Sequence, residues 1–272
     1  MVAEAKPEGG RPRPRVPGVL DGEVVPVMSL TDADRERMFA LLCTYYDAVS
    51  PERFRDDLDA KDDCIVLRDR EGEIQGFSTL TSITVGAGGR AHRGIFSGDT
   101  VIAEPYWGQR VLGRLFLRYL LRKKLARPFQ PLWWFLISKG YKTYLLMANN
   151  FREHYPRYER STPPDRRHIL ESFARSIFSD SFEPAEGVIR PREDLGWLRH
   201  GIAPITDELR RDPRISFFEA TNPEWHRGVE LACIARMTYL MPLAYGCKAV
   251  WRRVSRLLTP GTAQRARRKG AS

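Results

Sequence analysis

The stretch from residue 94 to residue 137 constrains the fold most, because a long helical pattern separates two strand-like runs in it. The runs are residues 94–103 and 132–137. Between them, leucine, phenylalanine and tyrosine recur at helical spacing over residues 111–126. Two strands joined through a helix form a crossover and lie parallel in one sheet. The sequence therefore predicts a sheet that is parallel in part.

Strand patterns also precede this crossover. Residues 64–68 are rich in β-branched side chains, residues 74–85 alternate, and short polar turns connect these runs to residues 94–103. Consecutive strands with short connections form an antiparallel meander. The glycine-rich stretch 86–89 is one of the turns. It joins two strands, whereas a dinucleotide-binding loop opens a helix, so we interpret it as structural.

Two helices are expected before the meander. Thr31 is a capping residue followed by acidic residues, and apolar positions recur at helical spacing through Tyr46. Ser50 and Pro51 repeat the start signal, which predicts a second helix from Pro51 to about Ala60. The predicted fold class is therefore α/β, with a mixed, partly antiparallel central sheet and helices on both faces.

The pattern is less regular after the second strand of the crossover. A helix is predicted over about residues 141–154. Residues 157–213 are polar and interrupted by prolines, with one helix near 166–178, and we interpret them as a helical insertion. Residues 215–220 and 229–235 are predicted to form a hairpin that completes the sheet.

The ends of the chain carry most of its net charge of +10. Residues 1–18 carry a net charge of +2 and residues 259–272 a net charge of +4, which leaves +4 for the rest. We predict a disordered tail over residues 1–20, one domain over 21–258 that closes with a basic amphipathic C-terminal helix, and a disordered basic tail. No nucleic-acid-binding motif accompanies the charge, so specific nucleic-acid binding is not expected.

The composition excludes several classes of protein. With 42% hydrophobic residues the chain can build a core, so a disordered polymer is excluded, and no run approaches the roughly 18 apolar residues of a membrane span. The four cysteines lack CxxC spacing and the five histidines lie far apart, so no metal site is predicted. The first residues contain no apolar stretch typical of a signal peptide. We therefore expect a cytoplasmic protein with reduced thiols.

The strand-to-helix junction at residues 100–117 is the clearest chemical signal. An acidic residue, a proline and two aromatic residues lead through Gly108 into the long helix. Amide groups at a helix start carry a positive partial charge and bind phosphate oxygens, and Arg110 and Arg114 add full charges there. An ordinary connecting loop with solvated arginines explains the same residues equally well.

Together with this junction, the order of elements over about residues 31–155 resembles the GNAT acyltransferase superfamily. In that family the junction carries Arg/Gln-x-x-Gly-x-Gly/Ala and holds the pyrophosphate of coenzyme A. Arg110 and Gly113 match the first and middle positions, but Leu115 stands where glycine or alanine lets the backbone approach the ligand. A second register, residues 107–110, keeps the aromatic residue, glycine, glutamine and arginine but lacks the glycines that follow.

The resemblance implies a coenzyme A thioester as donor, with an acyl carrier protein as an alternative donor, and no metal. The donor-binding residues it implies are Val101, Ile102, Gly108, Gln109, Arg110, Val111, Leu112, Gly113 and Arg114. A pantetheine arm would lie in an opening of the sheet between strands 94–103 and 132–137. Strands hydrogen-bonded along their full length would remove that channel.

The resemblance also implies roles for Asp99 and Tyr144. Asp99 lies on the strand before the junction, where the family places a carboxylate that accepts a proton from the attacking amine. An aspartate that accepts backbone hydrogen bonds at a β-bulge explains it equally well. Tyr144, on the helix after the buried strand, stands for the family's tyrosine that protonates the leaving thiolate. A core aromatic residue without a function explains Tyr144 as well.

The implied function is transfer of an acyl group to a small-molecule amine. The alternative is a catalytically inactive GNAT-like binding module that acts at a protein partner or a membrane surface. That module would use the basic amphipathic C-terminal helix, although such a helix more commonly packs on its domain with a solvated basic face.

Overall fold

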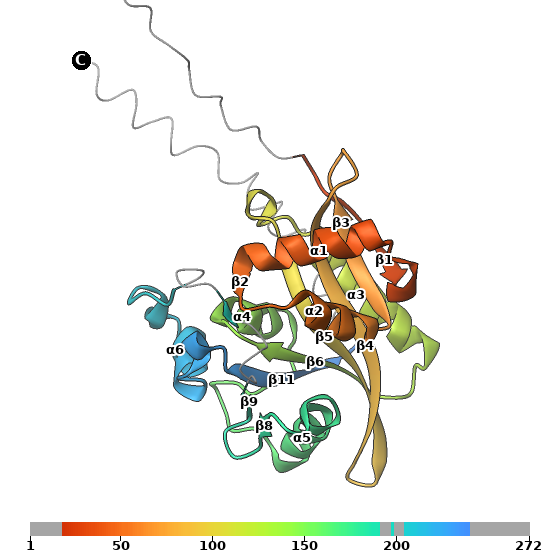
Figure 1. Cartoon of the computed structure of the whole chain (residues 1–272). Helices are drawn as coiled ribbons and strands as arrows, with labels where there is room; N and C mark the ends of the chain where they lie inside the picture. The colour runs from red at the N-terminus through yellow and green to blue at the C-terminus, as the bar shows by residue number, and fades with distance from the viewer. Residues whose placement is uncertain (1–17, 191–196, 199–203, 240–272) are drawn as a thin grey trace, which may run out of the picture.

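The computed structural model describes residues 18–190, 197–198 and 204–239 (Figure 1). The main sheet contains β1 (Asp21–Pro26), β3 (Asp63–Arg68), β4 (Ile74–Ala87), β5 (Arg90–Ile102), β6 (Leu132–Ser138), β7 (His154–Tyr155), β8 (Phe182–Glu183), β9 (Val188–Ile189) and β11 (Glu230–Met237). Its strand order is β1-β3-β4-β5-β6-β11-β9-β8, and β7 also pairs with β11. Neighbouring strands are antiparallel except β5 and β6, which are parallel. The mixed sheet predicted from the crossover is confirmed.

Helices cover both faces of this sheet. They are α1 (Asp32–Tyr45), α2 (Pro51–Asp59), α3 (Val111–Ala126), α4 (Tyr141–Asn150), α5 (Pro164–Phe178) and α6 (Pro213–Thr221), with short 3-10 turns at η1 (Val27–Ser29), η2 (Glu104–Tyr106), η3 (Leu209–Arg211) and η4 (Trp225–Arg227). In Figure 1, α1 and α2 lie in front of the sheet and α3 lies behind it. Side chains of α3, α4 and α6 pack with Trp134, whereas those of α5 pack with Trp133 and Phe135. Because side chains alternate along a strand, β6 serves both core layers.

The local signals of the first half formed the expected elements. Thr31 and Asp34 form a reciprocal capping box at the start of α1, with both N···O distances 3.1 Å. Ser50 caps α2, with Pro51 in its first turn. The strong helical pattern after Arg110 became α3, and β4 and β5 form the predicted hairpin. The predicted α/β class with helices on both faces is confirmed.

The prediction of a strand at residues 215–220 is wrong, because these residues lie in α6. The Asp212 side chain accepts a hydrogen bond from the amide of Arg214, and Pro213 occupies the first turn. Ile215 and Phe218 are buried three residues apart, which is helical spacing. The predicted hairpin therefore does not exist. Its second half, β11, pairs with β6 instead.

The insertion at residues 157–213 packs on the domain through several small elements. Helix α5 covers one face of the sheet, and β8 and β9 extend its edge beside β11. A further short strand, β10 (Trp197–Leu198), pairs with β2 (Tyr46–Asp47) next to the end of α1. The insertion therefore reaches from the β11 edge back to the N-terminal helices.

Several predictions concern residues outside the described part of the chain. These are the tail before residue 18, most of the predicted C-terminal helix and the basic tail at 259–272. The described chain is already ordered at Leu20, which is buried in the core. None of the described helices has the length and apolar character required to cross a bilayer.

Candidate functional site

The sheet opens between β5 and β6. Their parallel pairing runs from Arg93 opposite Leu132 to Ser97 opposite Leu136. Beyond that point β5 continues to Ile102 paired with β4, while β6 is paired with β11. The β4–β5 register shifts here, so that Gly98 and Asp99 together face one residue of β4. Such a bulge bends its strand, which directs β5 away from β6.

A cavity of about 690 Å³ adjoins this opening, bounded by β5, α3, β6 and α4. We call it the donor cavity. Six of the nine predicted donor-binding residues line it: Ile102, Gly108, Gln109, Arg110, Leu112 and Gly113. The other three lie elsewhere. Val101 is buried beneath α1 and α2, Val111 is buried in the core under α3, and the exposed Arg114 does not line the cavity.

The amino-terminal end of α3 is a positive wall of the donor cavity. No side chain caps the helix, and its first hydrogen bond joins the Arg114 amide to the Arg110 carbonyl at 3.1 Å. The amides of Val111, Leu112 and Gly113 have no acceptor in the described part of the chain. Arg110 and Lys142 also line the cavity, and no acidic residue of the described chain lines it. This wall suits an anion.

Leu115, which departs from the family pattern, does not obstruct the donor cavity. A methyl group added at Gly22 of β1 would meet a Leu115 methyl carbon at 2.7 Å and one of Leu67 at 2.6 Å. Leu115 therefore packs on β1, away from the cavity. Gly108, at a φ of +85°, supplies the left-handed residue that turns the chain into α3.

Gln109 fixes the turn before α3 instead of offering its amide to a ligand. Its Oε1 accepts from the Leu20 amide, and its Nε2 donates to the Gly18 carbonyl, both at 2.9 Å. Trp107 donates to the Ile102 carbonyl at 2.7 Å, and the Lys142 ammonium lies 5.1 Å from the centre of its ring. The turn is thus held from both sides.

The wall of the donor cavity at the opening combines hydroxyl groups with aromatic rings. Ser97 accepts a hydrogen bond from Trp134 Nε1 at 2.9 Å, and the Ser78 and Thr100 hydroxyls lie 2.7 Å apart. Trp134 packs against Phe116, with ring centres 4.8 Å apart. An elongated ligand with both apolar and amide groups would meet both kinds of surface here.

Tyr144 does not line the donor cavity. It is fully buried, its hydroxyl donates to the Pro156 carbonyl at 3.2 Å, and its ring packs against Phe217 and Phe218. Burial raises the pKa of the Tyr144 hydroxyl. In this position the side chain fills the core between α4 and α6.

Asp99 lies at the bulge where β5 leaves β6. No hydrogen bond to its carboxylate is found in the described part of the chain, so the interpretation of a bulge aspartate that accepts backbone N–H groups has no support. Burial and the nearby Asp57 raise the pKa of Asp99, while Lys139 and Lys61 lower it. The carboxylate of Asp99 is therefore more basic than that of a solvated aspartate.

Two charged residues beside Asp99 escaped the sequence prediction. Lys139 follows β6 and Glu230 begins β11, and their side chains form an ion pair at 3.5 Å. Glu230 is nearly fully buried, which raises its pKa, while the Lys139 ammonium acts in the opposite direction and favours the carboxylate form. The sequence signal that could have found them is a charged residue next to an apolar strand: Lys139 after residues 132–138, and Glu230 before residues 231–235.

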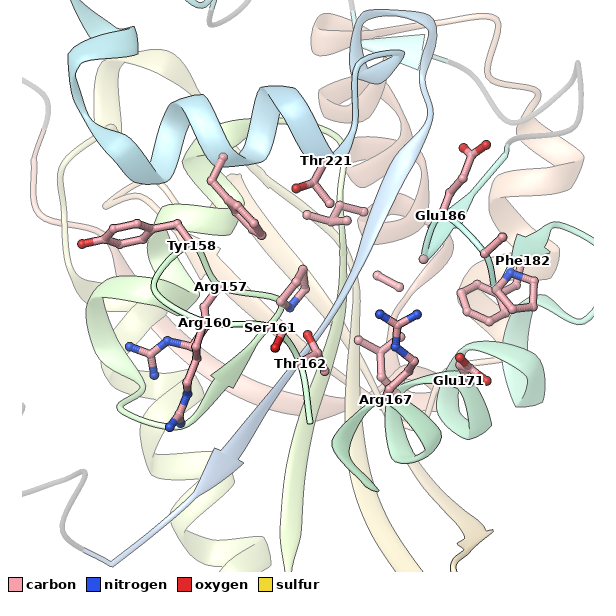
Figure 2. A pocket seen from close by; sticks show the side chains of 18 residues that line it. Arg157, Tyr158, Arg160, Ser161, Thr162, Arg167, Glu171, Phe182, Glu186 and Thr221 are labelled. Carbon is pink, nitrogen blue, oxygen red and sulfur yellow. The ribbon is translucent and has the colours of Figure 1, made fainter. Parts of the chain in front are cut away.

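A second cavity, of about 370 Å³, lies within the insertion (Figure 2). We call it the insertion cavity. Its walls come from the loop after β7, from α5, from the β8–β9 turn, and from α6 and β11. Arg167 extends into it from α5, and Glu171 and Glu186 line it as well. None of the predicted site residues lines this cavity. Among the described residues, no His, Cys, Asp and Glu group has the arrangement of a metal site.

No protein-family model matches the chain, and no curated protein matches its sequence. The structure is similar to parts of solved structures. One is a conserved protein of Enterococcus faecalis named as a probable N-acyltransferase, with a TM-score of 0.37 and 15% identity, covering 47% of this chain and 32% of that one. This chain thus spans about a third of the Enterococcus protein.

Two further similar structures come from other bacteria. The GNAT family N-acetyltransferase YhbS of Escherichia coli, in complex with CoA, has a TM-score of 0.35 and 17% identity, covering 53% of this chain and 73% of that one. An acyl-CoA N-acyltransferase of Pseudomonas aeruginosa has a TM-score of 0.35 and 18% identity, and the match covers 48% of this chain and 88% of that one. These likenesses concern the fold alone.

Proposed function

We propose that the protein transfers an acyl group from a coenzyme A thioester to an amine. The observation that carries the proposal is the separation of β5 from β6 beyond Ser97, beside a cavity that ends at the uncapped start of α3. An unpaired strand edge offers N–H and C=O groups to a ligand. The two amides of a pantetheine arm have the matching donors and acceptors.

The charges of the donor cavity support a phosphate-bearing donor. The first three amides of α3, Arg110 and Lys142 would hold the pyrophosphate. Among the residues that the structure describes, no acidic side chain lines the cavity to repel it. A carrier-protein donor has the same pantetheine arm but a single phosphate. Binding of coenzyme A should therefore depend on this positive wall more than binding of a carrier-protein donor does.

The chemical step requires one group of the chain to take a proton. The amine nitrogen attacks the thioester carbonyl and forms a C–N bond, the C–S bond breaks so that coenzyme A leaves as a thiolate, and the nitrogen loses a proton to Asp99. Asp99 suits this role because it lies at the opening, lacks a hydrogen-bond partner in the described chain and has a raised pKa. Tyr144 stays outside the proposed set, because its hydroxyl is bonded to Pro156 in the core.

Thermal melts with added ligand test the proposal. A ligand at 100 times its dissociation constant adds about 2.7 kcal/mol to the free energy of unfolding. We expect such stabilisation from coenzyme A, acetyl-coenzyme A or a long-chain acyl-coenzyme A, and its loss in Ser97→Leu, whose larger side chain would occupy the opening. If none of the three ligands stabilises the wild-type protein, the proposal fails and the inactive binding module is favoured.

A further inference from the structure

Three charged residues meet at one end of the sheet. Asp99 lies near the end of β5, and Lys139 directly follows β6, which runs parallel to β5. Strand β11 runs the other way, so its first residue, Glu230, reaches the same end, next to the pair formed by Leu231 and Ser138. The topology therefore gathers an aspartate, a lysine and a glutamate from three neighbouring strands where β5 and β6 separate.

These charges lie on the face of the sheet opposite the donor cavity. Leu231 packs in the core layer of α3, α4 and α6, whereas Ala232 and Ile137 pack in the layer of α5. Because side chains alternate, Glu230 and Lys139 belong to the second layer. In agreement, the Lys139 ammonium lies 4.9 Å from the centre of the Tyr46 ring, at the end of α1. The opening thus has two sides. We call the side of the donor cavity the donor side, and the side with Asp99, Lys139 and Glu230 the charged side.

The ion pair on the charged side is largely shielded from water. The side chains of Lys139 and Glu230 are only 18% and 10% exposed. Removing two charges from water costs more than a well-packed apolar pair would, so such a pair is weak evidence for a stabilising role. Burial alone would lower the pKa of Lys139, but Glu230, Tyr46 and Asp99 raise it, so the lysine is a fixed cation.

The charged side has one carboxylate in excess. Lys139 is matched by Glu230, and Lys61 is matched by Asp57 at 2.6 Å. Asp99 interacts with both lysines but forms no ion pair or hydrogen bond in the described chain. Because each lysine already has its own acid, the missing partner of Asp99 is a single positive charge. The ammonium group of an acceptor supplies one.

We propose that Asp99, Lys139 and Glu230 form the acceptor subsite, and that it selects an amine with no carboxylate beside its amino group. The inference rests on the proposed acyltransferase function. Asp99 holds the ammonium group and takes one proton from it, and the second proton that the nitrogen loses on acylation goes to the leaving thiolate of coenzyme A. Glu230 stays paired with Lys139. A free amino acid would bring a carboxylate to a place where the lysine is already neutralised and two acids repel it. Amino acids are therefore rejected.

Matched acceptors that differ by one carboxylate test this selectivity. The assay measures release of coenzyme A from acetyl-coenzyme A with phenethylamine against phenylalanine, tryptamine against tryptophan, and cadaverine against lysine. For the wild type, we expect kcat/KM to be at least about tenfold higher for the amine of a pair, as one charge-assisted contact gives. Equal rates, preference for the amino acid, or no release with any of the amines overturns the inference.

Variants of the ion pair make the test specific. Glu230→Gln frees Lys139 for the carboxylate of the acceptor, so the amine preference should fall by about tenfold. Replacing both residues with methionine removes the free cation again and should restore the preference. This double variant also protects the test against misfolding, since apolar replacement of a buried pair is often neutral or stabilising. Glu186→Gln in the insertion cavity is the matched control and should leave the amine preference unchanged.

Melts with coenzyme A separate the two proposals. If no coenzyme A ligand stabilises the wild-type protein, the proposed acyltransferase function itself is wrong. If coenzyme A binds and amines are acylated, but folded Glu230→Gln keeps the wild-type preference, only the acceptor subsite is wrong.

Discussion

The donor cavity and the insertion cavity differ in their charge balance and in the backbone that surrounds them. The donor cavity is lined by Arg110 and Lys142 without an acid, and it meets a free helix start and an unpaired strand edge. The insertion cavity holds three arginines together with Glu171 and Glu186, and one of those arginines, Arg157, is bonded through two nitrogens to Glu159 at 2.8 Å.

This difference shows that the number of arginines does not identify an anion site. A guanidinium already bonded to a carboxylate has little left to offer a phosphate, and nearby acids oppose its attraction. Backbone amides at a helix start need no such partner and are fixed in position by the helix. We therefore expect donor phosphates in the donor cavity, and mutations in the two cavities should have separable effects.

The largest expected effect is that of Asp99→Asn on turnover. Asparagine keeps the volume but cannot accept the proton, so kcat should fall by about 10²–10⁴-fold, the usual contribution of general-base catalysis. Because burial and Asp57 raise the pKa of Asp99 in the free enzyme, the acid limb of the wild-type profile of kcat/KM against pH should lie above 3.8, the ordinary aspartate value. The contribution of Asp99 to this limb should disappear in the variant. Glu171→Gln in the insertion cavity is the control. A kcat that stays within about threefold for Asp99→Asn would remove this residue from the mechanism.

A smaller effect is expected for the arginines of α3. Arg110→Ala should raise the dissociation constant of coenzyme A about 10- to 100-fold, since a charge-assisted contact is lost. Arg114→Ala, one turn further along and outside the cavity lining, should change it little. Calorimetric titration of both variants with coenzyme A measures the two dissociation constants and shows which arginine contacts the phosphates. Equal effects would place the phosphates along the exposed side of α3.

The smallest expected effect is that of Arg167→Ala in the insertion cavity. If the two cavities are independent, the affinity for coenzyme A should change by less than about twofold, a free-energy difference below about 0.4 kcal/mol. The same titration measures it. Weakening comparable to that of Arg110→Ala would contradict the contrast between the cavities and extend the donor site into the insertion.

The first half of the fold was predictable because its signals are local. The capping box at Thr31, the proline start of α2 and the apolar face of α3 each act within a few residues. Residues 215–220 also follow a local start signal, Asp212 and Pro213, but they are apolar and of strand length, so their composition alone favours a strand. The Asp212 cap and the burial of Phe218 decided for a helix.

The candidate site divides in the same way. The junction at Gly108–Gly113 was visible as a strand, a turn and a helix, and most of its residues line the donor cavity. The position of Tyr144 on its helix was also predictable, but not that its hydroxyl turns to Pro156 in the core. The direction of a side chain depends on what packs around it.

The sequence by itself determined the crossover, the start of the long helix after Gly108 and the position of Asp99 before it, because these follow from the spacing of apolar residues and the turn signals along one stretch of chain. Only the tertiary structure decided that β5 and β6 separate after Ser97 and that Lys139 and Glu230 meet beside Asp99. Glu230 lies 131 positions from Asp99 in the sequence. Contacts over such separations arise from strand order and register, and a single sequence carries no local pattern for either.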